Sequence, residues 1–346
     1  MSTQNAIAID PDWPKVTLDE ARAVLTAPGE RFEIEEVVIR GVPTRVWKNA
    51  PPSLALLIQY SLAMHADRVF SIYEDERVTY AANFRAVTAL AHKLVEMGVG
   101  KGDRVALAMR NLPEWPVVFF AATSIGAIIV PLNAWWTGGE LDYGLRDSGA
   151  KVLFVDGERH ERLKHYYAGL PDLARVVVAR AKGEIEPPAS RMELLIGTRA
   201  DWGDLPLAPL PEVEIAPDDP ATLFYTSGTT GNPKGALGTH RNICTNIMTS
   251  GYQTARMYLR RGETPPQPEP KTTLVVVPLF HVTACSAFLM GCIASGSTAV
   301  FMRKWDPVHA MELIQRERVQ ATGGVPTIAW QLLEHPDRGN YDLSSL

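Results

Sequence analysis

Thr226-Ser227-Gly228-Thr229-Thr230-Gly231-Asn232-Pro233-Lys234-Gly235 combines three glycines, four hydroxyl side chains and one lysine within ten residues. Glycines allow consecutive backbone N–H groups to turn towards one anion, and hydroxyl groups add further hydrogen-bond donors. The ammonium group of Lys234 adds a positive charge that can pair with phosphate oxygens. The composition of this segment therefore predicts a phosphate-binding loop.

The setting of this segment differs from that of a Walker A loop, in which glycine precedes the lysine and Ser or Thr follows it. Here Pro233 precedes Lys234 and Gly235 follows it. Short apolar runs flank the segment at Leu223–Tyr225 and Ala236–Gly238, so we expect the loop to join two strands. A Ser/Thr/Gly-rich surface turn is the alternative interpretation, but the match extends over ten positions.

Composition narrows the classes of protein to which this chain can belong. Its 346 residues are 46% apolar and carry a net charge of -5, which favours a globular fold and disfavours nucleic acid as a partner. Three cysteines without a CxxC pair favour a reducing compartment over a disulfide framework or structural zinc. The first ten residues lack the features of a secretion signal, so we expect a cytoplasmic protein without a transmembrane segment. The sequence leaves open whether the protein forms a homodimer.

The order of predicted elements indicates an α/β fold with two packed, doubly wound sheets and helices in layers. We expect an N-terminal arm over 1–52, a first α/β subdomain over 53–183, a proline-rich linker over 184–219 and a second subdomain over 220–346. Buried strands are predicted at Arg104–Met109, Ala127–Val130, Val152–Val155, Val176–Val178, Thr273–Val277, Thr298–Met302 and Val319–Thr322. Helices are predicted at Leu18–Leu25, from Phe84 to Met97, at Pro113–Ser124, Gly139–Arg146, around His160 and His165, at Thr239–Ala255, after His281, from Asp306 and at Thr327–Glu334.

Further motifs surround the loop in a fixed order. They are Val78-Thr79-Tyr80, Gly98–Val105, Gly126–Asn133, Gly149-Ala150-Lys151, Pro278-Leu279-Phe280-His281 and Gly324-Val325-Pro326-Thr327. Together with the loop, they resemble the adenylate-forming superfamily, which includes acyl-CoA synthetases, aryl-CoA ligases, luciferases and the adenylation domains of peptide synthetases. The resemblance covers both predicted subdomains.

The resemblance implies a reaction in which a carboxylate attacks the α-phosphate of ATP, giving acyl-AMP and pyrophosphate. A thiol such as coenzyme A or a carrier-protein thiol then takes the acyl group. Lys234 and His281 are the residues expected to act in catalysis. Phosphate binding is assigned to Thr226, Ser227, Gly228, Thr229, Thr230, Gly231 and Lys234. Substrate binding is assigned to Phe280, His281, Val282, Thr283, Gly324, Val325, Pro326 and Thr327.

The residue after Phe280 narrows the substrate class. Peptide-synthetase adenylation domains place Asp there, where it pairs with the amino group of an amino acid, whereas this chain has His281. The resemblance therefore implies an aliphatic or aryl carboxylic acid as substrate. A core histidine is the alternative role for His281, and simple packing is the role expected of Trp135 and Trp136.

Other parts of the superfamily pattern are not found in these 346 residues. They include a Tyr-Gly-x-Thr-Glu motif, whose Glu helps to bind Mg²⁺, and a small C-terminal domain with a catalytic lysine. The resemblance therefore implies the larger, N-terminal part of a family member, which we expect to be inactive by itself. A non-catalytic module that binds a nucleotide or an acyl group is the alternative.

Overall fold

The computed structural model describes residues 13–226, 231–267 and 269–346, and its contacts divide the chain into two compact units. One unit comprises the described residues of 1–50 and 245–268, and the other comprises those of 51–244 and 269–346. The long helix α8 (His240–Arg260) begins in the larger unit and continues into the smaller one. Each unit is described by itself below.

The smaller unit contains α1 (Leu18–Leu25), the antiparallel hairpin β1 (Ile34–Ile39) and β2 (Val42–Trp47), and most of α8. The prediction for α1 is confirmed, and its start is fixed by a capping box between Thr17 and Glu20. Phe32 is buried in a small core with Met248, where it contacts the rings of Trp47 and Tyr252. The hairpin was not predicted.

A seven-stranded sheet forms one half of the larger unit, with the strand order β11-β10-β6-β5-β7-β8-β9. All neighbouring strands are parallel except the β10–β11 pair, which is antiparallel. The strands are β5 (Arg104–Ala108), β6 (Ile128–Pro131), β7 (Val152–Asp156), β8 (Arg175–Ala179), β9 (Ala189–Arg191), β10 (Pro220–Thr226) and β11 (Lys234–Thr239). The continuous apolar runs of β5, β6 and β7 are buried along their lengths, as expected of parallel strands covered on both faces.

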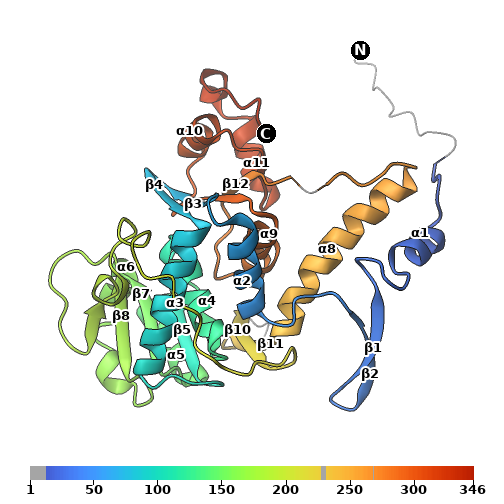
Figure 1. The fold of residues 1–346 in the computed structure, drawn as a ribbon. Helices are drawn as coiled ribbons and strands as arrows, with labels where there is room; N and C mark the ends of the chain where they lie inside the picture. The colour runs from blue at the N-terminus through green and yellow to red at the C-terminus, as the bar shows by residue number, and fades with distance from the viewer. Residues whose placement is uncertain (1–12, 227–230, 268) are drawn as a thin grey trace. The chain divides into compact units, whose positions relative to one another are not determined.

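A five-stranded sheet forms the other half, in the order β14-β12-β13-β3-β4. Its strands are β3 (Val69–Tyr73), β4 (Glu76–Thr79), β12 (Thr272–Val275), β13 (Thr298–Phe301) and β14 (Ala321–Thr322), and only the β3–β4 pair is antiparallel. Figure 1 shows β3 and β4, from early in the chain, in one sheet with β12 from much later.

Strands from the two expected subdomains pair with each other, so each sheet contains strands from both. β3 and β4 come from the expected first subdomain but belong to the sheet of β12, β13 and β14. Conversely, β10 and β11 come from the expected second subdomain but extend the sheet of β5 and β6. The α/β fold with two sheets is confirmed, whereas the partners of these strands depend on long-range contacts that local sequence patterns do not encode.

Helices cover the sheets, and several begin at caps that are visible in the sequence. Thr79, Thr137 and Asp306 each accept a hydrogen bond from a backbone N–H group in the first turn of the helix that follows. These helices are α2 (Leu54–His65), α3 (Tyr80–Glu96), α4 (Glu114–Ser124), α5 (Gly138–Ser148), α6 (Gly157–Leu163), α7 (Glu193–Ile196), α9 (Met290–Ser295), α10 (Pro307–Glu317) and α11 (Pro326–Leu333). Short helices η1 (Tyr167–Gly169) and η3 (Pro336–Asn340) are 3₁₀ turns, and η2 (Thr283–Leu289) is a π-helix.

Near the predicted site and in α6, the structure differs from the predicted elements. The strand expected to reach Val277 ends at Val275, and the helix expected after His281 begins as the π-helix η2. His160 lies in α6, but His165 lies beyond the end of that helix.

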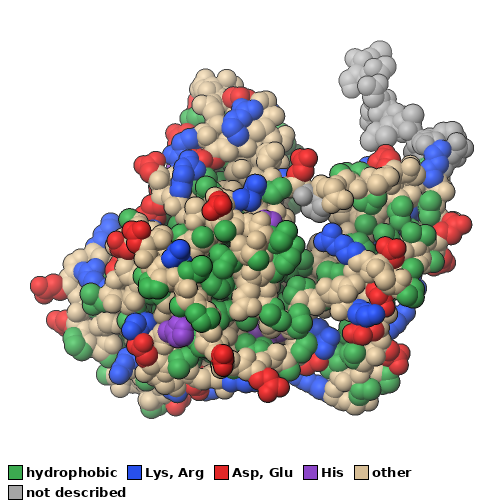
Figure 2. Space-filling model, viewed as in Figure 1, with side chains coloured by type: hydrophobic (Ala, Val, Ile, Leu, Met, Phe, Trp, Pro, Cys, Tyr) green, Lys and Arg blue, Asp and Glu red, His purple; other side chains and the backbone are tan. Residues whose placement is uncertain are grey.

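Helix α2 is apolar on more than one side. Its buried face includes Leu54, Leu57 and Ile58, whereas Leu56, Tyr60 and Met64 are exposed, and Figure 2 shows green hydrophobic side chains over this helix. No helix among the described residues is both long enough and apolar enough to cross a membrane.

Candidate functional site

The glycine- and threonine-rich loop connects β10 to β11. Thr226 and Lys234 face each other in the register of this hairpin, and the Thr226 hydroxyl lies 3.4 Å from the Lys234 carbonyl oxygen. The expectation that the loop joins two strands is therefore confirmed. Four residues assigned to phosphate binding, Ser227, Gly228, Thr229 and Thr230, lie outside the described residues.

The end of the loop is held by a helix of the same unit. Tyr143 of α5 donates a hydrogen bond from its hydroxyl to the Pro233 carbonyl oxygen, at 3.0 Å. Next to it, Tyr225 donates to Asp147 at 2.6 Å, and both burial and this carboxylate raise the pKa of Tyr225. Lys234 follows Pro233 with an exposed side chain that forms no ion pair within the described ranges. The ammonium group is thus available to a ligand of the loop.

A turn after β12 presents two more of the expected site residues. The His281 N–H group donates to the Pro278 carbonyl oxygen at 3.0 Å, and His281 Nδ1 accepts from the Thr283 N–H group at 3.2 Å. His281 is exposed, so it does not have the core position considered as an alternative. Phe280 is half-buried and meets the ring of Trp135 edge to face, with 5.3 Å between ring centroids. Val282 and Thr283 are exposed at the start of η2.

The glycine-containing segment between β14 and α11 supplies the remaining expected residues. Gly324, Val325, Pro326 and Thr327 are all exposed, and Pro326 is the first residue of α11. A Cβ atom at Gly324 would lie 2.8 Å from Cδ1 of Ile328, so the backbone approaches this side chain closely. Val325 and Thr327 line a neighbouring cavity.

This cavity has a volume of about 550 Å³ and lies among segments that follow five different strands. Its lining residues come from the segments after β5, β6, β12, β13 and β14 and from α11. They are Arg110, Asn111, Trp135, Val276, Val277, Pro278, Met302, Arg303, Lys304, Trp305, Val325, Thr327, Ile328 and Gln331. Clefts at the carboxyl ends of parallel strands are common ligand sites in α/β proteins.

Arg110 and Trp135 were not assigned to the site from the sequence, and simple packing was the role expected of Trp135. Trp135 is 56% exposed and lies between Phe280 and the Arg110 guanidinium group, which is 5.5 Å from its ring centroid. Burial and the nearby Arg159 lower the pKa of Arg110 to about 10, so it remains a cation at neutral pH. Both residues come shortly after buried strands, and this position is the sequence feature that could have identified them as site residues.

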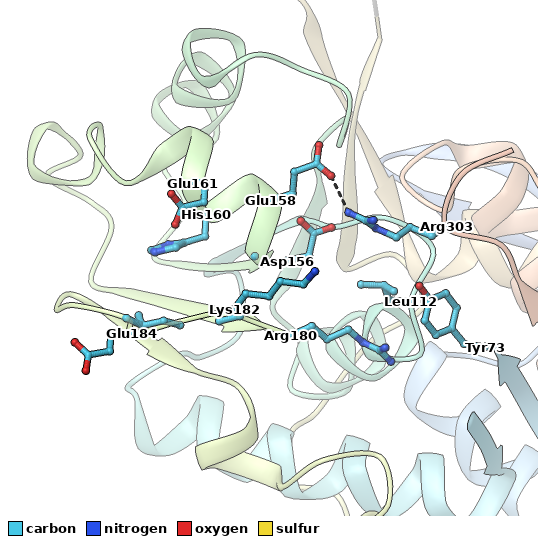
Figure 3. Close-up of a pocket in the computed structure, with 13 residues that line it drawn as sticks. Tyr73, Leu112, Asp156, Glu158, His160, Glu161, Arg180, Lys182, Glu184 and Arg303 are labelled. Carbon is cyan, nitrogen blue, oxygen red and sulfur yellow. Dashed lines mark hydrogen bonds and ion pairs between the residues drawn. The ribbon is translucent and has the colours of Figure 1, made fainter. Parts of the chain in front are cut away.

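A second cavity of about 460 Å³ has a different character, because charged side chains line much of it. Figure 3 shows Arg180, Lys182 and Arg303 around it together with Asp156 and Glu158, and Arg303 pairs with Glu158 at 2.8 Å. Arg303 also lines the 550 Å³ cavity, so the two cavities share this residue. An apolar space and a charged space therefore lie next to each other.

Metal ligands are not gathered in the part of the chain that the structure describes. Within it, no group of three or more His, Cys, Asp or Glu side chains is suitably placed to hold a metal ion. This finding concerns a preformed cage alone, because Mg²⁺ is usually held by one or two carboxylates together with the phosphates of its substrate.

Comparisons with known proteins agree with the fold and with the superfamily that the motifs resemble. The family model described as "AMP-binding enzyme" matches residues 58–346. A feruloyl-CoA synthase from Amycolatopsis is 34% identical over 270 residues, which are 78% of this chain and 48% of that protein. The chain spans about half the length of the curated relatives it matches.

Two solved structures have folds similar to that of this chain. The inhibitor-bound N-terminal domain of FACL13 from Mycobacterium tuberculosis matches with a TM-score of 0.71 and 26% identity, covering 86% of this chain and 68% of that one. The anthranilate CoA ligase AuaEII, solved with anthranoyl-AMP, matches with a TM-score of 0.73 and 24% identity over 85% of this chain and 54% of that one. The latter similarity supports the fold alone.

Proposed function

The chain belongs to the family of AMP-binding enzymes, and from this premise we propose that it activates a carboxylic acid with ATP and passes the acyl group to coenzyme A. In the first step, a carboxylate oxygen bonds to the α-phosphorus of ATP, and the bond from that phosphorus to the β-phosphate oxygen breaks. Pyrophosphate leaves with the electron pair of that bond. In the second step, the thiol sulfur bonds to the acyl carbon, loses its proton and displaces AMP.

The loop between β10 and β11 is the observation that carries this proposal. Backbone N–H and hydroxyl donors from Thr226 to Gly231 would bind the β- and γ-phosphates, and Lys234 would offset the charge that develops on departing pyrophosphate. The Tyr143 hydrogen bond to Pro233 supports this role, because it limits the positions open to the neighbouring Lys234. Mg²⁺ would enter with the phosphates of ATP and offset part of their charge.

The substrate is proposed to be an aliphatic or aryl carboxylic acid, with an aryl acid favoured. His281 occupies the position at which an amino-acid substrate would need a carboxylate, and its exposed ring is free to border a substrate carboxylate. Phe280, Val282 and Thr283 on one side and Gly324 to Thr327 on the other are the proposed contacts. The 34% identical relative named feruloyl-CoA synthase supports an aryl acid.

Coenzyme A is proposed as the acyl acceptor. Its thiol arm is long and thin, and its nucleotide end carries several phosphate charges. Adjacent apolar and charged cavities that share Arg303 suit a molecule of this kind, and Lys182 lines the charged one without an ion pair in the described ranges. Titration calorimetry with coenzyme A, in the presence of AMP and ferulate, tests this assignment, and failure to detect binding would contradict it.

Replacement of Lys234 tests the phosphate loop. Titration calorimetry with MgATP should give an affinity at least about tenfold lower for Lys234→Ala than for the wild type, because a charge-assisted hydrogen bond is lost. Lys93→Ala is the control, since Lys93 pairs with Glu96 on the exposed side of α3. Equal ATP affinities in the wild type and both variants would remove Lys234 from the site.

A catalytic assay, together with a measurement of how ferulate changes ATP binding, separates the ligase from a non-catalytic binding module. Pyrophosphate release is measured with MgATP and ferulate as the probe acid. We expect little turnover from these 346 residues alone, because they contain no match to the Tyr-Gly-x-Thr-Glu motif. Robust ferulate-dependent release would show that this expectation is wrong and would support the ligase directly. ATP binding that ferulate neither strengthens nor weakens would favour the binding module.

A further inference from the structure

Asn111 lies between the two sheets of the larger unit, directly after Arg110 at the end of β5. Its side chain is buried, with 4% exposed, and forms three hydrogen bonds to the backbone of the segment that follows β12. Nδ2 donates to the carbonyl oxygens of Val275, at 3.2 Å, and Val277, at 3.1 Å. Oδ1 accepts from the N–H group of Leu279 at 2.8 Å. Both N–H donors of the amide are therefore in use.

These three hydrogen bonds hold the backbone at and beyond the end of β12, where its pairing with neighbouring strands stops. The last residue of β12 is Val275, so Val277 and Leu279 lie outside the strand. Leu279 is 1% exposed, and a buried N–H group needs a partner. Asn111 supplies that partner from the other sheet. A single side chain thus sets the path of the backbone that leads from β12 into the Pro278–His281 turn.

We propose that Asn111 is a positioning residue that fixes the Pro278–His281 turn and thereby sets the affinity for the carboxylic acid, an inference that rests on the proposed function. Asn111 acts through the turn, because its two N–H donors are already bound to backbone carbonyl groups. The residue after Leu279 is Phe280, whose ring meets Trp135, and the next is His281. A shift of the Leu279 backbone would therefore move both proposed substrate contacts.

The first test is spectroscopic and does not depend on any ligand. The eight tryptophans are labelled with 5-fluorotryptophan, and the Trp135 fluorine resonance is assigned with the Trp135→Phe variant. Asn111→Asp keeps the acceptor for Leu279 but removes both N–H donors. We expect it to displace the Trp135 resonance, because Phe280 moves against that ring. Acidification, which protonates the new carboxyl group and restores one donor, should return the resonance towards its wild-type position.

Asn49→Asp is the matched control. Asn49 also donates through Nδ2 to two backbone carbonyl groups, those of Glu30 and Arg31, but it lies in the smaller unit. Its replacement removes the same chemical groups and should leave the Trp135 resonance unchanged. Equal displacement by both variants would show a general loss of structure and would overturn the proposed role of Asn111.

The second test measures binding. Asn111→Asp should weaken ferulate binding by about tenfold in the presence of MgATP, while the affinity for MgATP itself changes by less than about twofold. Equal losses for both ligands would overturn the inference, because a structural defect would affect both. If the wild type binds neither ligand, the proposed function fails, whereas the fluorine resonance still decides whether Asn111 positions the turn.

Hydrogen exchange keeps the inference testable if Asn111→Asp does not fold. In the wild type, the Leu279 amide should exchange at least about tenfold more slowly than the amide of exposed Val282, although Leu279 lies outside the strand. Asn111→Ser, with one hydroxyl group, should lose part of this protection. Equal exchange rates for Leu279 and Val282 in the wild type would show that the bond to Asn111 does not hold the turn.

Discussion

At the scale of single residues, the site depends on hydroxyl and amide groups that fix the backbone beside the proposed ligand contacts. Tyr143 gives a direct test, because its hydroxyl group bonds to the Pro233 carbonyl oxygen just before Lys234. Tyr143→Phe removes only that hydroxyl. We expect the affinity for MgATP to fall about three- to tenfold, the range for one lost hydrogen bond, as measured by titration calorimetry.

The control for this prediction is Tyr60→Phe. Tyr60 is 53% exposed on α2, so loss of its hydroxyl should change neither ATP affinity nor stability. If Tyr143→Phe also binds MgATP as the wild type does, the Tyr143 bond does not hold the loop in its binding conformation.

At the scale of helices and strands, the start of α8 is joined to the start of α2 by a buried histidine. His240 is 0% exposed, and its Nδ1 atom accepts a hydrogen bond from the Leu54 N–H group at 3.2 Å. Burial lowers the pKa of His240 from 6.5 to about 4. As the pH falls from 6.5 towards 4, the unfolded chain takes up a proton at this position before the folded protein does. His240 therefore makes the protein less stable over this range.

The prediction is an acid-dependent loss of folding free energy that disappears when His240 is replaced. Between pH 7 and pH 5, His240 should account for a loss of about 2 kcal/mol, measured by urea denaturation. His240→Asn keeps an acceptor near the position of Nδ1 but cannot take up the proton, so its stability should fall less over this interval. His92→Asn, at an exposed position, should behave like the wild type. Identical pH profiles for all three proteins would refute the assignment to His240.

Sequence patterns predicted the elements whose signals are local. Asp306 as a cap and Pro307 as the first residue of α10 are both present in the structure, and α4 is buried over its whole length as its apolar run suggested. Helix α2 was missed because it is apolar on its exposed as well as its buried side, so it lacks the helical period. The partner of β3 could not be predicted, because β13 lies more than two hundred residues later in the chain.

Site residues, too, could be predicted only where the evidence lies within one short stretch of sequence. Lys234 and His281 could be assigned because each lies in a contiguous motif. Trp135 could not, since its contacts with Arg110 and Phe280 bring together three separate segments.

At the scale of the whole molecule, a group of four charged side chains joins the two sheets of the larger unit. Arg180, directly after β8 of the seven-stranded sheet, bonds to Glu114 at 2.9 Å and to Glu76 of β4 in the five-stranded sheet at 2.6 Å. Arg199 bonds to the same two carboxylates, at 3.1 Å to Glu114 and 2.9 Å to Glu76. Glu114 is 2% exposed, whereas both arginine side chains retain contact with solvent. Replacement of the Glu114 carboxylate would remove an acceptor that Arg180 and Arg199 share.

Glu114→Gln should therefore lower the free energy of unfolding by about 1–3 kcal/mol, because the amide Nε2 group cannot accept a hydrogen bond and leaves an arginine donor without its acceptor. Urea denaturation at pH 8 is the appropriate measurement, because burial raises the pKa of Glu114 and the carboxyl group must be charged in the reference protein. Glu317→Gln is the control. Glu317 also meets two arginines, Arg77 and Arg316. Although the Glu317 side chain is 5% exposed, both arginines are well exposed and can be rehydrated, so the expected loss is smaller than that for Glu114→Gln. A loss for Glu114→Gln no larger than that of the control would mean that this group of charges does not stabilise the junction of the two sheets.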